Sequence, residues 1–193
     1  MIKYLFVITL LLMSCDKKKN IYVSMETQLG NIIIELYPKK APITVQNFLK
    51  YINENRYEDF HFYRTVHLNN QPNNKIKIEV IQGGLGLNKH PLTLPPIIHE
   101  STNLTKIKHL DGTISMARLE PGTASSEIFI CINNQKELDF GGQRNLDKQG
   151  FAAFGKVISG MDIVKNIHSQ NEDKQLLDNF IQVNNIKLKG IYD

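Results

Sequence analysis

The chain has 193 residues, of which 41% are hydrophobic and 22% are charged, and its formal net charge is +4. This length and composition suit one globular domain with a sizeable core, and they exclude a disordered or fibrous protein. The lysines are scattered apart from one run at residues 17–19, so the chain lacks the basic stripe that nucleic acid requires, and we expect no nucleic-acid partner.

Residues 1–15 have the pattern of an export signal. They read MIKYLFVITLLLMSC, one lysine followed by an apolar run about half as long as the ~20 residues that a membrane-spanning helix needs. The last four resemble the bacterial lipoprotein box, in which the cysteine, here Cys15, is lipidated and becomes the new N-terminus. The alternative is an ordinary secretory signal with a chance cysteine. We expect a signal peptide at residues 1–15, a short tether at 16–20 and one domain at 21–193.

Lipidation of Cys15 would anchor the domain to a membrane of the bacterial cell envelope, on its extracytoplasmic, periplasmic side. The tether spans at most ~17 Å, so the three lysines would face anionic headgroups. Cys131 would then have no disulfide partner. Because it lies inside the apolar run IFICI and no activating base is evident, we expect a buried core residue and not a nucleophile.

The first half of the domain shows a hairpin, a helix and a strand. Residues 21–27 and 32–36 are β-rich runs joined around a Gly-Asn pair, which is typical of a hairpin. Pro42 suits the first turn of a helix, and apolar residues recur at helical spacing up to about residue 53. Residues 60–66 (FHFYRTV) predict a strand carrying Arg64. An arginine there is usually solvent-facing, yet a single guanidinium with few polar neighbours can have a directional role.

Connecting segments follow. Residues 67–77 form a polar insertion, expected to be a surface hairpin or loop. Residues 79–86 (EVIQGGLG) end a strand in glycines, and without a following Lys-Ser/Thr pair they predict a bulge or turn rather than a phosphate-binding loop. Residues 87–109 read as loop. The six histidines of the chain show no metal-ligand spacing, and we expect neither a metal nor a cofactor.

The second half holds three short apolar runs, at residues 114–117, 128–132 and 151–157, which favour buried strands. The small residues at 120–126 predict a loop beside a groove, of which these strands form one wall. A helix at 160–167 and a closing strand at 183–191 complete the pattern. The expected architecture is mainly β: a closed or nearly closed antiparallel barrel capped by two helices.

Five ordered blocks, FYRTV, VIQGG, GTISMAR, SSEIFICI and FAAFGKVISGMDIV, follow a TxxGxIxIELY start. In this order they resemble the cyclophilin-type peptidyl-prolyl isomerases over almost the whole domain. The resemblance implies an eight-stranded antiparallel barrel with a helix at each end. It also implies a groove on the barrel wall that takes an extended peptide around a proline, no cofactor, and a monomer.

The resemblance also assigns the site. Arg64 matches the catalytic arginine, Gln82 the glutamine that orients it, and Phe129 the floor of the proline pocket. The other matching positions are Val80, where the family usually has methionine, the pocket leucine Leu138, and Ala117 in the groove lining.

The rim departs from the family pattern at five positions. Arg118 and Glu127 replace an asparagine and a glutamine, Tyr63 replaces the histidine beside the arginine, Phe151 replaces a histidine or tyrosine, and Glu137 stands where an aromatic residue is common. A carboxylate at 127 could hold Arg64 in place or draw it away from substrate, with Arg118 as a competing partner.

The implied reaction is rotation about X–Pro bonds, whose slow exchange can limit folding. The leading hypothesis is therefore an envelope-anchored prolyl isomerase acting on proline-containing segments of exported proteins. The alternative is a binding module or chaperone that holds proline segments in the same groove without useful turnover.

Overall fold

The computed structural model describes residues 20–86, 88 and 90–192. The expected signal peptide, lipidation site Cys15 and most of the tether lie outside these residues. Within the described part of the chain, no helix is long and apolar enough to cross a membrane.

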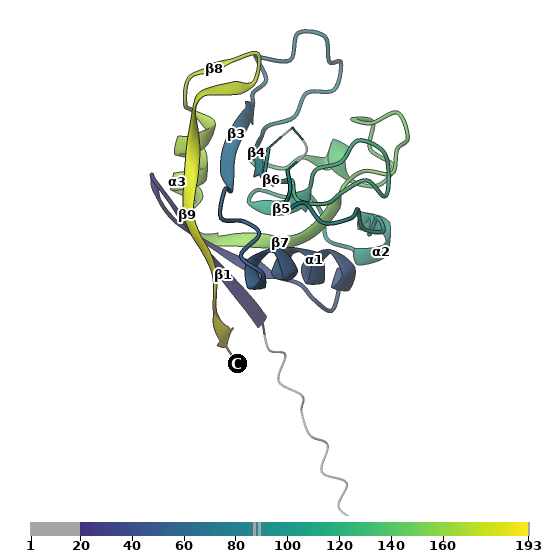
Figure 1. The fold of residues 1–193 in the computed structure, drawn as a ribbon. Coiled ribbons are helices and arrows are strands. Elements are labelled where there is room, and N and C mark those ends of the chain that lie inside the picture. The colour runs from purple at the N-terminus through teal and green to yellow at the C-terminus, as the bar shows by residue number, and fades with distance from the viewer. Residues whose placement is uncertain (1–19, 87, 89, 193) are drawn as a thin grey trace, which may run out of the picture.

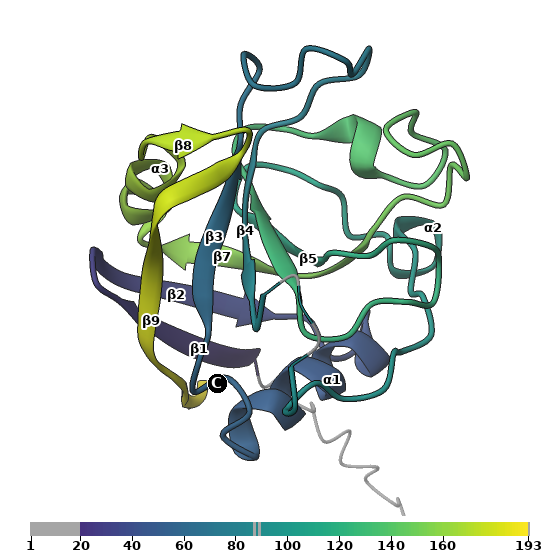
Figure 2. The ribbon, with the colours of Figure 1, turned by 45° about the horizontal axis from the view of Figure 1, so that its top comes forward.

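In the described part of the chain, eight antiparallel strands form the barrel, and a ninth, very short strand pairs with the last of them (Figures 1 and 2). The neighbours around the sheet follow the order β1-β2-β7-β5-β6-β4-β3-β9-β8. The strand bounds are β1 Asn20–Thr27, β2 Gly30–Leu36, β3 His61–Val66, β4 Val80–Gly84, β5 Thr113–Met116, β6 Ile128–Cys131, β7 Ala152–Ser159, β8 Glu172–Asp173 and β9 Leu176–Tyr192.

Pairing between the first and last long strands closes the barrel. β1 pairs with β2 on one side and with β9 on the other, for example Val23 with Leu188 and Met25 with Ile186. Closure removes the exposed sheet edges that an open sheet would leave. The expected closed eight-stranded barrel is confirmed. β9 begins seven residues before the expected strand at 183, and β8 was not expected.

The two expected helices are confirmed. α1 (Pro42–Asn53) and α3 (Met161–His168) lie at different ends of the barrel, as Figure 2 shows. Each turns apolar side chains into the interior, among them Phe48 from α1 and Ile167 from α3. The start of α1 is capped by a residue far away in the sequence: the buried Glu100 carboxylate accepts the Thr44 N–H at 2.7 Å.

The segment expected to be loop at 87–109 contains a third, four-residue helix, α2 (Thr102–Thr105), and a 3₁₀ turn covers Lys136–Leu138. A helix this short has no room for the apolar periodicity that reveals longer ones, so the sequence pattern could not indicate it.

Apolar side chains form two separate clusters, one inside the barrel and one against its outer wall. Alternation along the strands separates them, since Ile128 and Ile130 point inward while Phe129 and Cys131 point outward. The outer cluster consists of Val66, Ile78, Val80, Phe129, Cys131 and Leu138, with Ala117 and Phe151 packed against it. Cys131 is completely buried there, which confirms the expected core residue.

Candidate active site

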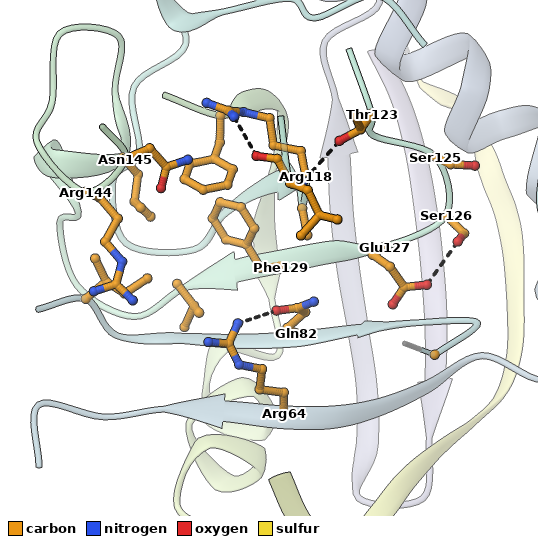
Figure 3. Close-up of a pocket in the computed structure, with 17 residues that line it drawn as sticks. Arg64, Gln82, Arg118, Thr123, Ser125, Ser126, Glu127, Phe129, Arg144 and Asn145 are labelled. Carbon is orange, nitrogen blue, oxygen red and sulfur yellow. Dashed lines mark hydrogen bonds between the residues drawn. The ribbon is translucent and has the colours of Figure 1, made fainter. Parts of the chain in front are cut away.

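A groove of about 470 Å³ lies over the outer apolar cluster, within the range common for ligand pockets. All nine residues assigned to the groove from the sequence line it (Figure 3): Arg64, Val80, Gln82, Ala117, Arg118, Glu127, Phe129, Leu138 and Phe151. Of the other lining residues, Thr123, Ser125 and Ser126 belong to the loop at 120–126 that the sequence placed beside the groove. The sequence did not place the remaining five there: Ile78, Gly86, Leu119, Arg144 and Asn145.

Three of these residues form a row across neighbouring strands. Arg64 on β3 is paired with Gln82 on β4, which is paired with Phe129 on β6. Cross-strand partners share a face of the sheet, so all three side chains reach the outer wall. Figure 3 shows the Arg64 head group inside the groove, next to Gln82 and on the Phe129 side of β3.

A register shift in β3 is what turns Arg64 outward. Residues 62 and 64 would share a face in a regular strand, yet the Phe62 ring lies in the interior core while Arg64 lines the groove. The pairing of β3 shifts between these two residues against both neighbouring strands. An inserted residue of this kind re-aims the side chains that follow it.

Two glutamines hold the Arg64 guanidinium. Its Nη1 donates to Gln82 Oε1 at 2.7 Å, and its Nε and Nη2 donate to Gln175 Oε1 at 3.1 and 2.5 Å. A guanidinium has five N–H donors, so two have no acceptor among the described residues. Burial lowers the pKa of Arg64 from its ordinary value. The side chain is nevertheless a permanent cation at physiological pH.

Gln82 is oriented by Tyr63, which is oriented by Glu127. The Gln82 Nε2 donates to the Tyr63 hydroxyl at 2.7 Å, and that hydroxyl donates to Glu127 Oε2 at 2.7 Å. Because the amide nitrogen of Gln82 faces a hydroxyl, its oxygen faces Arg64. Glu127 therefore reaches Arg64 only through two intermediaries, and the structure shows no direct carboxylate–guanidinium pair between them.

The Glu127 carboxylate is largely buried, and burial raises its pKa. Four donors oppose that rise: Tyr63, Ser126, and the backbone N–H groups of Leu85 and Gly86. Burial, with Glu127 beside it, also raises the pKa of the Tyr63 hydroxyl, which stays protonated and able to donate.

Arg118 does not compete for Glu127, contrary to the possibility that the sequence left open. Its guanidinium forms a bidentate pair with the Asp147 carboxylate, with Nη1 and Nη2 donating at 2.8 and 2.9 Å. It also donates to the Gly150 carbonyl. It lies 5.1 Å from the centre of the Phe151 ring, a cation–π distance. Arg118 therefore joins two loops above the groove.

Phe129, Val80 and Leu138 form an apolar slot in the groove, and the floor of this slot is closely packed. Phe129 and Leu138 are 4% and 1% exposed, and the Phe151 ring meets Phe129 edge-on at 5.3 Å between centroids. His109 stacks behind Phe129 at 5.8 Å and bonds to Asp139 at 2.9 Å. Although its segment was expected to be loop, His109 is almost fully buried, and burial lowers its pKa.

Glu137, where the family often has an aromatic residue, does not line the groove, and its carboxylate accepts the N–H of Gln143 at 2.9 Å. Among the described residues, no group of three or more His, Cys, Asp or Glu side chains could hold a metal ion.

Fold and groove together define a class of protein: a closed antiparallel barrel whose outer wall offers an apolar slot beside a fixed cation. Residues 22–188 match the family described as cyclophilin type peptidyl-prolyl cis-trans isomerase/CLD. The chain belongs to this family, and it is a peptidyl-prolyl cis-trans isomerase.

Individual relatives agree with this assignment. A peptidyl-prolyl cis-trans isomerase of Acinetobacter baylyi is 40% identical, with 81% of this chain and 77% of the relative covered. Peptidyl-prolyl cis-trans isomerase B of Escherichia coli is 34% identical, with 75% and 82% covered. The fold resembles a Cryptosporidium parvum cyclophilin crystallised in the presence of the dipeptide Ala-Pro, with a TM-score of 0.69, 21% identity, and 88% and 99% of the chains covered.

Proposed function

We propose that this isomerase accelerates X–Pro rotation in exported proteins of the bacterial cell envelope, with Arg64 as the catalytic residue. The chemistry of the site supports the role of Arg64, and the sequence of residues 1–15 supports the location. Folding of exported chains can wait on slow X–Pro isomerisation, so an anchored catalyst in that compartment would remove a rate limit.

Rotation about the X–Pro bond must cross a barrier of roughly 18–20 kcal/mol, because the resonance of the amide is lost at the twisted midpoint. No covalent bond forms or breaks. As the bond twists, the proline nitrogen regains its lone pair and becomes a hydrogen-bond acceptor. A donor fixed at that nitrogen stabilises the transition state more than either ground state, which is the requirement for catalysis.

The single observation that carries this proposal is the way Arg64 is held. Its guanidinium is bound on one side by Gln82 and on the other by Gln175, next to the apolar slot, and two N–H groups remain for a substrate. The slot formed by Phe129, Val80 and Leu138 would take the proline ring while the preceding carbonyl swings. Phe129, Arg64 and Gln82 then act without acid–base chemistry.

A soluble form beginning at Asp16 separates this function from that of a binding module. Isomerisation of a proline-containing peptide would be followed by protease-coupled turnover, and binding of the same peptide by calorimetry. We expect binding together with acceleration. Peptide binding with no acceleration would support a proline-segment holdase instead.

The anchor has its own test in a bacterial host that processes lipoproteins. Metabolic labelling with a fatty acid should tag the full chain, and Cys15→Ala should abolish the label. Cys131→Ala is the matched control, because that thiol is completely buried in the outer cluster. Label that survives Cys15→Ala would refute lipidation at this cysteine.

We also propose that the domain acts as a monomer, which sedimentation of the soluble form would check.

A further inference from the structure

The turn between β8 and β9 has an unusual composition for its shape. Asp173 pairs with Leu176, so Lys174 and Gln175 form a two-residue hairpin turn, and both have positive φ, +51° and +78°. Turns with positive φ at both central residues strongly favour Asn and Gly, because other side chains are strained there. The geometry of the turn does not favour glutamine at position 175, so a contact outside the turn has to account for this residue.

The side chain of Gln175 supplies that reason through its contact with Arg64. Its single Oε1 accepts two N–H groups of the guanidinium, from Nε at 3.1 Å and Nη2 at 2.5 Å. The backbone of the turn is fixed to the same strand, since the Gln175 carbonyl accepts the Thr65 N–H at 2.9 Å. The turn is therefore bound to β3 beside the arginine.

The other end of the Gln175 amide is held by the polar insertion after β3. Gln175 Nε2 donates to the Asn70 carbonyl at 2.8 Å, which leaves the amide oxygen facing Arg64. Asn70 is itself anchored, because its side chain accepts the His67 N–H at 2.8 Å and donates to the Thr65 carbonyl at 3.2 Å. Figures 1 and 2 show the β8–β9 turn beside the loop that leaves β3.

We propose that Gln175 is a positioning residue for Arg64, and that the insertion at residues 67–77 serves this isomerase by fixing the Gln175 amide. An arginine side chain has several rotatable bonds, and one acceptor at Gln82 leaves its plane free to swing. A second acceptor at the opposite edge fixes the plane and directs the remaining N–H groups toward the slot. The inference rests on the proposed role of Arg64.

The alternative is that Gln175 matters only for the shape of the turn, and glycine separates the two. Gln175→Gly deletes the acceptor while giving the turn the residue that tolerates positive φ best. Lys174→Gly relieves the adjacent position and adds similar backbone freedom, but it keeps the Gln175 side chain. Gln175→Met retains the length and the backbone preference of the native residue without an oxygen.

The experiment measures kcat and KM for a proline peptide, the melting temperature, and the NMR signal of the Arg64 Nε–H. For both Gln175→Gly and Gln175→Met we expect kcat to fall about tenfold, the effect of losing a hydrogen bond to a charged group. KM should change less than about twofold, since the slot is intact. The Arg64 Nε–H signal should shift and exchange faster with water. Lys174→Gly should match the wild type in kcat and in this signal.

Activity within twofold of the wild type in both Gln175 variants, with an unchanged Arg64 Nε–H signal, would overturn the inference. So would an equal loss of kcat in Lys174→Gly, because the turn shape alone would then explain the effect. Arg64→Ala keeps this result apart from the proposed function. If that variant is inactive while both Gln175 variants are active, only the inference fails; if Arg64→Ala is active, the proposed function fails as well.

Discussion

Removal of the Tyr63 hydroxyl tests the chain of hydrogen bonds that leads from Glu127 to Arg64. Tyr63→Phe keeps the ring, which is 2% exposed, and deletes a hydroxyl that accepts from Gln82 and donates to Glu127, both at 2.7 Å. A hydrogen bond to a charged group contributes about 1.5–3 kcal/mol and a neutral one about 1 kcal/mol. Partial compensation by water makes a loss of roughly 2 kcal/mol in the free energy of unfolding the expected result.

For a domain of this size, that loss corresponds to a fall of about 4–8 °C in the melting temperature. Without the hydroxyl, Gln82 loses the partner that orients its amide, so we expect kcat/KM to fall about three- to tenfold. Chemical denaturation and the protease-coupled assay measure the two effects. A variant that unfolds and isomerises as the wild type does would refute the chain of contacts.

A double variant that combines Tyr63→Phe with Glu127→Gln tests whether the two residues act together. If Tyr63 and Glu127 act as one unit, their effects on the free energy of unfolding should be non-additive by at least about 0.5 kcal/mol. Simple additivity would mean that the two residues contribute independently, whatever the distance between their oxygens.

Two further predictions concern the rim. Burial raises the pKa of Glu127, so the folded state disfavours its ionised form; that penalty is present above the folded pKa and disappears as pH falls toward the unfolded value of about 4.3. Urea unfolding should therefore show the wild type gaining stability relative to Glu127→Gln between pH 7 and pH 4, and a loss would contradict the buried carboxylate. Arg118→Ala removes the link to Asp147 and Gly150 and the cover over Phe151, so KM should rise several-fold with kcat little changed; a pure loss of kcat would instead place Arg118 at the reacting bond.

Much of the barrel architecture could be predicted because local sequence patterns, namely helical spacing and short apolar runs, indicate its helices and strands. The helix Pro42–Asn53 has apolar residues at helical spacing, and the short apolar runs are strands because both of their faces are covered. The members of the groove were found through the family resemblance, and the structure brings them together. Periodicity alone would have put Arg64 on the same face as Phe62, inside the barrel.

The features that could not be predicted from the sequence depend on contacts between distant residues, which leave no local sequence pattern. The register shift in β3 arises from pairing with two distant strands. Gln175 lies in a hairpin turn without the Asn-Gly signature, so neither the turn nor its contact with Arg64 could be predicted. Arg144 reaches the groove from a loop, where it donates to the carbonyl of Ile76 in the insertion. Such a contact between two loops leaves no periodic signal.

The role of Arg64 is tested most directly by Arg64→Ala, with turnover and binding of one proline peptide measured on the same sample. Loss of a preorganised donor typically costs ~2.7–4 kcal/mol in the transition state. We therefore expect kcat/KM to fall by at least about two orders of magnitude, while the dissociation constant for the peptide changes only a few-fold because Phe129 and Leu138 are untouched. Near-wild-type turnover in this variant would contradict the account.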